Sequence, residues 1–187
     1  MRVVCISDTH GRHREIQLPP GDILIHAGDI SHFGKEHQIK DFNEWLGSLP
    51  FSHKIVIAGN HEINGKFDLR KLLSNATYLR DQVVEVANLK IYGIAYYGYP
   101  TAELFTVPEV DILVSHNPPY TIGEHGDFGC KVLLEYVEKV KPKLHVFGHV
   151  HFAHCVYTND NTTFINAAIC GGKYEYGVAH SPEVFDL

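Results

Sequence analysis

Several features that would assign this chain to a specialised class are scarce or missing from its 187 residues. No apolar run approaches the roughly 20 residues that a membrane-spanning helix needs. Met1 leads directly into a strand-like segment, without a secretory leader. We therefore expect a cytoplasmic protein that makes no contact with membranes.

Cysteine and basic residues are also sparse. The four cysteines are scattered and form no CxxC pair, which indicates reduced thiols rather than a disulfide framework. Basic residues are outnumbered by acidic ones, and the formal net charge is -6. Binding to extended nucleic acid needs a basic surface that neutralises phosphates, so we do not expect such a partner. The cysteines are Cys5, Cys130, Cys155 and Cys170.

The remaining composition is that of a globular protein. Hydrophobic residues make up 44% of the chain and charged residues 20%, and there is no low-complexity tract, internal repeat or linker. A domain of this size buries roughly 70% of the surface of its unfolded chain. We expect one domain that spans residues 1–187.

One pattern recurs along the chain. A short apolar run rich in β-branched residues ends in a small residue, and a side chain able to bind metal follows it. Because these runs do not alternate with polar residues, they are typical of strands buried on both faces. The five segments are Val3 to His10, Ile23 to Asp29, Lys54 to His61, Asp111 to Pro119 and Leu144 to His151.

Helical and hairpin patterns lie between these strands. Apolar residues spaced three and four apart predict helices over Glu36 to Leu49 and Cys130 to Val140, and a weaker pattern covers Lys66 to Leu73. Short paired strands are expected within Val83 to Ala95 and within Cys155 to Ile165. The predicted fold is α/β (α+β), a four-layer sandwich of two mixed sheets flanked by helices. Its functional site should lie at the carboxyl ends of the strands.

The loops after the five strands deliver carboxylate, carboxamide and imidazole groups. This mixture of nitrogen and oxygen ligands suits a divalent cation of borderline hardness. One ion needs only four to six ligands, so the set predicts two ions and a spare catalytic residue, and either carboxylate could bridge the ions. The residues are Asp8, His10, Asp29, Asn60, His61, His116, His149 and His151.

The other histidines receive simpler interpretations. Those inside apolar runs, His26 and His145, are expected to be buried supporting residues. His154 is expected to take no part in the site. His13, His37, His53 and His180 are expected to be solvated.

The blocks that carry these residues resemble, in order and spacing, those of the calcineurin-like metallophosphoesterase superfamily. They are Asp8-x-His10, Gly28-Asp29, Gly59-Asn60-His61-Glu62, His116 and Gly148-His149-x-His151. Finer stretches such as GDILIHAGD and PKLHVFGHVH are similar to its metallophosphoesterase-domain-containing branch.

The resemblance implies a β-sandwich that holds two divalent ions, Mn²⁺ first, with Fe, Zn, Co or Ni as alternatives. It implies that His61 is the general acid and that Glu62 orients it. Asn60, His61 and Asn117 are expected to bind substrate. One ion would have the ligands Asp8, His10, Asp29 and His151, and the other Asp29, Asn60, His116 and His149, so that Asp29 bridges them.

One departure from the wider superfamily bears on the substrate. In phosphoprotein phosphatases the second block resembles Gly-Asp-x-x-Asp-Arg. In this chain the block begins with Gly28-Asp29, and its last two positions are His32 and Phe33. An arginine fork suits a dianionic monoester, and phenylalanine cannot supply it. His32 could replace the support that the second aspartate gives. We therefore expect hydrolysis of a small phosphodiester or a cyclic nucleotide.

Two alternatives remain open: a phosphomonoesterase or protein phosphatase, and a non-catalytic scaffold similar to a retromer subunit. Three segments could line the substrate pocket. They are Asn117 to Tyr120, Gly123 to Gly129 and Tyr96 to Tyr99.

Overall fold

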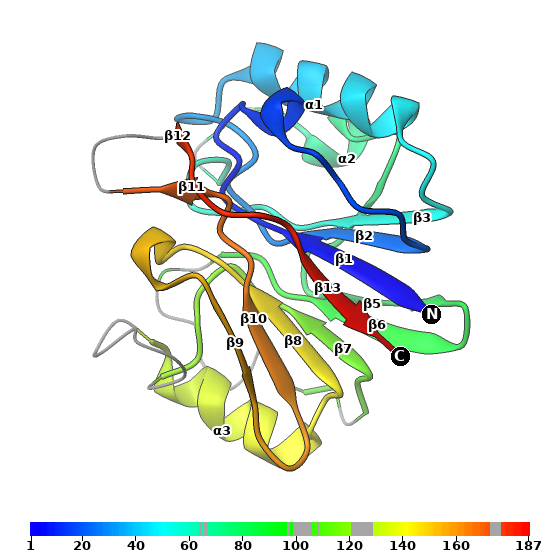
Figure 1. Cartoon of the computed structure of the whole chain (residues 1–187), viewed down its shortest axis with the longest axis vertical. Helices are drawn as coiled ribbons and strands as arrows, with labels where there is room; N and C mark the ends of the chain where they lie inside the picture. The colour runs from blue at the N-terminus through cyan, green and yellow to red at the C-terminus, as the bar shows by residue number, and fades with distance from the viewer. Residues whose placement is uncertain are drawn as a thin grey trace.

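Two β-sheets lie face to face between layers of helix in the computed structural model of the chain (Figure 1). The structure describes residues 1–63, 65, 67–96, 98, 106–107, 109–120, 129–172 and 177–187.

The first sheet has the strand order β13-β1-β2-β3-β4. Strands β1 to β4 are parallel, and β13 pairs antiparallel with β1. The strands are β1 (Arg2–Ile6), β2 (Ile23–His26), β3 (His53–Val56), β4 (Thr77–Tyr78) and β13 (Glu183–Asp186).

The second sheet has the order β5-β6-β7-β8-β10-β9. Its centre is parallel, and an antiparallel strand closes each edge. The strands are β5 (Gln82–Val86), β6 (Leu89–Gly93), β7 (Ile112–Val114), β8 (Leu144–Phe147), β9 (Cys155–Thr158) and β10 (Thr163–Asn166). A small pair, β11 (Cys170–Gly171) and β12 (Gly177–Val178), lies outside both sheets.

The strands are buried on both faces because each sheet is covered twice. In β1, Val3 and Cys5 point into the cluster between the sheets, whereas Val4 and Ile6 point into the cluster beneath the helices. Side chains alternate between the faces of a strand, so apolar residues on both faces require a partner layer on each side. The predicted four-layer α/β sandwich is confirmed.

Helix α1 (Glu36–Ser48) packs Phe42 and Trp45 against the outer face of the first sheet, and α3 (Lys131–Val140) packs Tyr136 against the second. Both match the predicted helices to within one residue. The weaker helix prediction, over Lys66 to Leu73, was too long, because α2 covers only Leu69–Leu72. The Asp68 carboxylate caps this helix by accepting from the backbone N–H of Arg70. Short 3₁₀ turns are η1 (His13–Glu15) and η4 (His151–Ala153).

Both predicted hairpins are present. Ala87 and Asn88 connect β5 to β6 with positive φ angles of 51° and 64°, which is the backbone of a two-residue hairpin turn. The Asn159 side chain accepts from the backbone N–H of Asn161 and Thr162 in the turn between β9 and β10. The four cysteines are free thiols. Within the described residues, no helix is long and apolar enough to cross a membrane.

Candidate metal centre

The loops that follow β1, β2, β3, β7 and β8 converge where the two sheets meet. Strands β1, β2 and β3 belong to one sheet and β7 and β8 to the other. The site is therefore built from both halves of the sandwich, at the carboxyl ends of parallel strands, as the sequence predicts.

The first donor group combines Asp8, His10 and His151, whose ligand atoms all lie within 4.8 Å of one another. His151 Nε2 is 3.1 Å from Asp8 Oδ1 and 3.2 Å from His10 Nε2. The spacing fits a single cation.

The second donor group combines Asp29, His116 and His149 within the same distance. Asn60 completes it, because its Oδ1 is 3.0 Å from His116 Nε2 and 2.9 Å from His149 Nδ1. His116 Nδ1 faces the Ala27 carbonyl at 2.8 Å, which accepts its proton and leaves Nε2 to face the centre. This group also has the spacing of one cation site.

Asp29 lies between the two groups. Its Oδ2 is 3.3 Å from His116 Nε2 in the second group and 4.0 Å from His10 Nε2 in the first. Its Oδ1 accepts from the backbone N–H of His61 at 2.9 Å, which fixes the carboxylate plane. Asp29 Oδ2 thus faces a histidine of each group, whereas the side-chain contact of Asp8 is with His151 of the first group.

Four of these residues have left-handed backbones that turn their side chains off the strand axis. Asp8, His10, Asp29 and His149 have φ angles of 54°, 46°, 56° and 69°. Such conformations are costly for residues other than glycine, and they concentrate at functional sites. A left-handed residue cannot continue an extended strand, so these four residues lie in the loops after β1, β2 and β8 and not within the strands.

Two glycines make room for the carboxylates. A Cβ atom on Gly59 would overlap Asp29 Oδ1, and one on Gly148 would overlap Asp8 Oδ2. Each glycine thus allows a carboxylate to approach its backbone closely: Asp29 comes from the neighbouring strand β2, and Asp8 comes from β1 of the other sheet.

The electrostatics favour cations at both positions. Burial disfavours ionisation of Asp8, but the hydrogen bond with His151 and the charge of His116 outweigh it and hold the pKa of Asp8 below its usual value. Burial lowers the pKa of His10 and of His149 to about 4, so both imidazoles are neutral and offer lone pairs.

The pair formed by His116 and Asp29 leads to the same conclusion. Burial lowers the pKa of His116, but the Asp29 carboxylate more than reverses this and raises it to about 9. The pair thus stabilises a positive charge at the position where an ion would supply one. With this chemistry and this spacing, the residues present fit two divalent cations.

His61 lies beside the centre without belonging to either donor group. Its Nε2 is 3.8 Å from Asp29 Oδ2, and its ring centroid is 4.7 Å from that of His10. The backbone N–H of Phe33 donates to His61 Nδ1 at 2.8 Å, and the Phe33 ring stacks on it. Because Nδ1 is the acceptor, the neutral ring carries its proton on Nε2, which faces the centre.

The expected role of Glu62 needs correction. The Glu62 carboxylate is buried and accepts from the backbone N–H and hydroxyl of Ser31 and from the backbone N–H of Gly59. Among the described residues, it makes no hydrogen bond with His61. Glu62 joins the loop after β2 to the loop after β3, whereas the hydrogen bond to the His61 ring comes from the backbone of Phe33.

His32 was not included in the predicted ligand set. His10, His32 and His61 nevertheless have ring nitrogens within 4.8 Å of one another, so His32 extends the site on its outer side. In the sequence, the position of His32 three residues after Asp29 could have indicated that it belongs to the site. That position predicts only that His32 replaces the support of an aspartate.

The other histidines divide into buried and exposed residues. His26 and His145 are fully buried, as predicted: His26 bonds Thr9 Oγ1, and His145 bonds Ser115 Oγ. The prediction for His13 was wrong, because its side chain is buried beneath α1 and bonds Asp41 at 2.9 Å. His37 and His53 are exposed, and His180 is half-buried against the His154 ring.

Asn117 follows His116 and donates from its amide to the Gly98 carbonyl at 3.0 Å. It is therefore anchored beside the second donor group. Most of the loop expected between Gly123 and Gly129, together with Tyr97 and Tyr99, lies outside the described residues.

Comparisons with known proteins agree with this geometry. Residues 1–153 match the family model described as calcineurin-like phosphoesterase. The chain is 42% identical to a UPF0046 protein of Caenorhabditis elegans, covering 100% of this chain and 81% of that protein. It is 38% identical to metallophosphoesterase domain-containing protein 1 of Homo sapiens, covering 100% of this chain and 71% of that protein.

Solved structures share the fold at lower identity. The protein TT1561 of Thermus thermophilus has a TM-score of 0.61 at 10% identity, covering 88% of each chain. A structure described as a novel archaeal phosphodiesterase has a TM-score of 0.52 at 20% identity, covering 93% of this chain and 87% of that chain.

The chain belongs to the calcineurin-like phosphoesterase family, whose members use a binuclear metal centre. Within that family, its relatives are metallophosphoesterase domain-containing protein 1 and the UPF0046 proteins, which is the branch that the sequence motifs indicate.

Proposed function

We propose that this protein is a metal-dependent phosphodiesterase that hydrolyses small phosphodiesters, including cyclic nucleotides. The observation that carries the proposal is the placement of Asp29 Oδ2 between two complete donor groups, 3.3 Å from His116 and 4.0 Å from His10. Two bound divalent ions, with Mn²⁺ the first choice, would activate water and polarise the phosphoryl oxygens.

The chain's own residues perform the remaining steps. Asp29 holds the two cation positions together, and Asn60 and His61 border the space that a phosphate would enter. His61 Nε2–H points toward that space, where it donates a hydrogen bond to the departing oxygen and stabilises the negative charge that develops there; the oxygen takes its proton from water. The bond from Phe33 keeps Nδ1 from competing for this role.

The preference for a diester rests on Phe33. Its side chain is 71% exposed at the position where phosphoprotein phosphatases carry arginine. A monoester dianion would gain no bidentate contact there, whereas a diester monoanion needs less positive charge around it.

The test compares turnover of bis(p-nitrophenyl) phosphate and p-nitrophenyl phosphate by Mn²⁺-loaded protein. We expect the diester to be hydrolysed faster, with activity lost on chelation and restored by Mn²⁺. Faster hydrolysis of the monoester would favour the phosphomonoesterase alternative. Absence of turnover on both substrates by metal-loaded protein would favour the scaffold alternative.

A further inference from the structure

Two buried side chains outside both donor groups, His26 and Thr9, are hydrogen-bonded to each other beneath the metal centre. His26 is the last residue of β2, and Thr9 lies in the loop after β1. Neither side chain is exposed to solvent. The His26 ring packs edge-on against Phe42 of α1, with the ring centroids 4.9 Å apart, so its position is fixed by packing as well as by hydrogen bonds.

The hydrogen bonds of this pair form a chain with one direction. The backbone N–H of Gly28 donates to His26 Nδ1 at 3.2 Å. Burial lowers the pKa of His26 to about 3, so the ring is neutral and carries its single proton on Nε2. Nε2–H then donates to Thr9 Oγ1 at 2.9 Å, and the Thr9 hydroxyl donates to the Ile30 carbonyl at 3.3 Å. Each donor in the chain has an acceptor.

The residues joined by this chain are sequence neighbours of the metal ligands. Gly28 and Ile30 flank Asp29, and Thr9 lies between the two ligands of the loop after β1. The backbone N–H of His10 also donates to the Asp29 carbonyl at 3.1 Å. The two loops are therefore connected by side-chain bonds on both sides of Asp29 as well as by their backbones.

The ligands concerned are held in conformations that need such support. Asp8, His10 and Asp29 all have left-handed backbones, which cost free energy and persist only where the surrounding structure holds them. Because the chain restrains the residues before and after Asp29, it keeps the carboxylate facing a histidine of each donor group.

We propose that His26 and Thr9 are positioning residues, whose hydrogen bonds hold Asp8, His10 and Asp29 in the geometry that binds the two cations. The inference concerns how the ions are held, so it does not depend on which phosphoester the protein hydrolyses.

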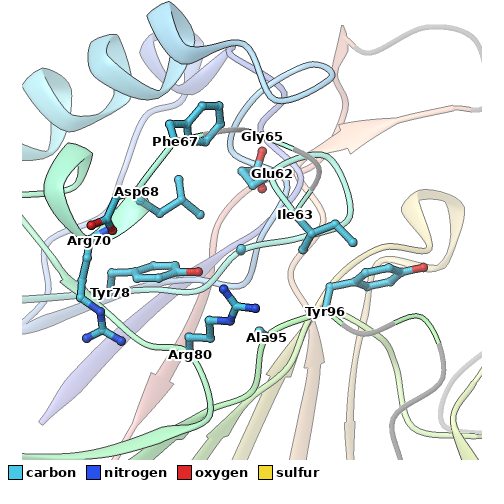
Figure 2. Close-up of a pocket in the computed structure, with 12 residues that line it drawn as sticks. Glu62, Ile63, Gly65, Phe67, Asp68, Arg70, Tyr78, Arg80, Ala95 and Tyr96 are labelled. Atoms are coloured by element: carbon cyan, nitrogen blue, oxygen red, sulfur yellow. The ribbon is translucent and has the colours of Figure 1, made fainter.

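Neither residue borders the large cavity beside the metal centre. That cavity has a volume of about 570 Å³ and lies between the loop after β3, helix α2 and the ends of β4 and β6. Figure 2 shows Glu62, Tyr78 and Tyr96 among the residues that line it. The described lining residues include neither His26 nor Thr9, so substitutions at these two positions alter none of them.

Two substitutions of Thr9 separate its hydrogen bonds from its packing. Thr9→Val keeps the shape of the side chain and removes the hydroxyl, whereas Thr9→Ser removes the methyl group and keeps the hydroxyl. In calorimetric titrations with Mn²⁺, Thr9→Val should weaken binding by about 10- to 100-fold, the usual cost of losing a group that orients a metal ligand. Thr9→Ser should bind Mn²⁺ nearly as tightly as wild type.

Urea unfolding of the metal-free proteins tests whether the effect is only a loss of stability. Thr162→Val makes the same change at a buried threonine in the turn between β9 and β10, and it should leave Mn²⁺ binding unchanged. A merely structural role would make Mn²⁺ affinity follow the unfolding midpoint across the three variants. We expect the affinity to follow the presence of the Thr9 hydroxyl instead.

A substitution of His26 tests whether the two residues act together. His26→Asn keeps an acceptor for the Gly28 N–H, but its side chain is too short to reach Thr9. It should weaken Mn²⁺ binding about as much as Thr9→Val does. The double variant should be little weaker than either single variant, because each substitution breaks the same chain.

The inference is overturned if Thr9→Val binds Mn²⁺ as wild type does, if Thr9→Ser and Thr9→Val weaken binding equally, or if wild-type protein binds no Mn²⁺. Fully additive effects in the double variant would also overturn it. If His26→Asn does not fold, the two Thr9 variants decide. If metal-loaded wild type hydrolyses no phosphodiester while Mn²⁺ affinity still follows the Thr9 hydroxyl, the proposed function fails and the positioning role stands.

Discussion

The backbone N–H of Phe33 donates to Nδ1 of His61 over 2.8 Å. The contact joins the loop after β2 to the loop after β3, and it sets which nitrogen of His61 holds the proton. A backbone donor cannot rotate away or change its protonation state. The orientation of His61 therefore depends on the left-handed turn at Phe33, where φ is 59°.

Replacing His61 with Gln should reduce turnover without removing metal. His61 belongs to neither predicted ligand set, so metal content measured by mass spectrometry should stay near the wild-type value. Turnover should fall by about 10²- to 10³-fold, the usual cost of losing one donor to a developing oxyanion. The loss should be largest for diesters with poor leaving groups, whose departing oxygen develops the most negative charge. His37→Gln, at an exposed position, is the matched control. An unchanged rate with a poor leaving group would remove His61 from the mechanism.

Replacing Asp29 with Asn should disturb both cation positions at once, because its carboxylate contacts a histidine of each donor group. We expect loss of both ions, or binding of less than one ion per chain, in metal titrations followed by calorimetry. Asp160→Asn changes the same charge at an exposed site and should bind as wild type does. A variant that still binds two ions with wild-type affinity would contradict the bridging position of Asp29.

Replacing Phe33 with Arg should shift the enzyme toward monoesters. The side chain is 71% exposed, so the change should not disturb folding. A guanidinium at this position can contact the extra charge of a monoester dianion, and we expect the ratio of monoester to diester kcat/KM to rise by about tenfold. Phe33→Leu keeps the backbone N–H bond to His61 and controls for loss of the ring. If the ratio does not move, Phe33 does not determine the preference.

Replacing Glu62 with Gln should destabilise the metal-free protein. The amide can accept only on its oxygen, so its NH₂ group would face a backbone N–H that the carboxylate now satisfies. We expect the free energy of unfolding in urea to fall by about 1–3 kcal/mol. Unfolding should be measured at pH 8, so that the Glu62 carboxyl group is ionised. Burial and the charge of Asp29 raise the pKa of Glu62 to about 7. Glu135→Gln, at an exposed position of α3, should change the stability little, and an equally small effect at Glu62 would contradict its linking role.

Acid should destabilise the metal-free protein partly through His145. Burial lowers the pKa of His145 to about 3, against about 6.5 in an unfolded chain, so the unfolded state binds the extra proton. Its contribution to stability is complete above about pH 6.5 and declines as the pH falls toward 3. By pH 5 the loss from this residue should reach about 2 kcal/mol.

The variant His145→Gln isolates that contribution. The amide can keep the bond to Ser115 Oγ, which is 2.8 Å from His145 Nε2, but it does not titrate. Urea unfolding at pH 7.5 and pH 5 should show a smaller loss of stability in the variant by about 2 kcal/mol. Equal losses in variant and wild type would mean that His145 is not held neutral in the folded state.

The architecture and the convergence of the loops could be predicted from the sequence because both follow from short-range pattern. An unalternating strand such as β1 must be covered on both faces, and the carboxyl ends of parallel strands meet at one edge of the sheet. The residues after the strands, Asp8 and Asp29 among them, therefore pointed to a shared centre before any distance was known.

The errors arose where partners come from distant segments. His13 lies in a polar stretch and was expected to be solvated, but α1 covers it and Asp41 bonds its ring. Glu62 follows His61 directly, yet its hydrogen bonds go to Ser31 and Gly59. Sequence adjacency does not reveal the direction of a side chain in a turn, and no local pattern indicates that a backbone N–H will replace a carboxylate partner.

The division of the donor groups between the two sheets has a consequence for turnover in the cell. Asp8, His10 and Asp29 follow strands of one sheet, whereas His116, His149 and His151 follow strands of the other. Ions bound by residues of both sheets would link the two sheets. A ligand whose concentration is 100 times its dissociation constant stabilises the folded chain by about 2.7 kcal/mol. The concentration of available metal would then determine how often the two sheets separate. It would therefore affect the resistance of the chain to proteases as well as its catalytic activity.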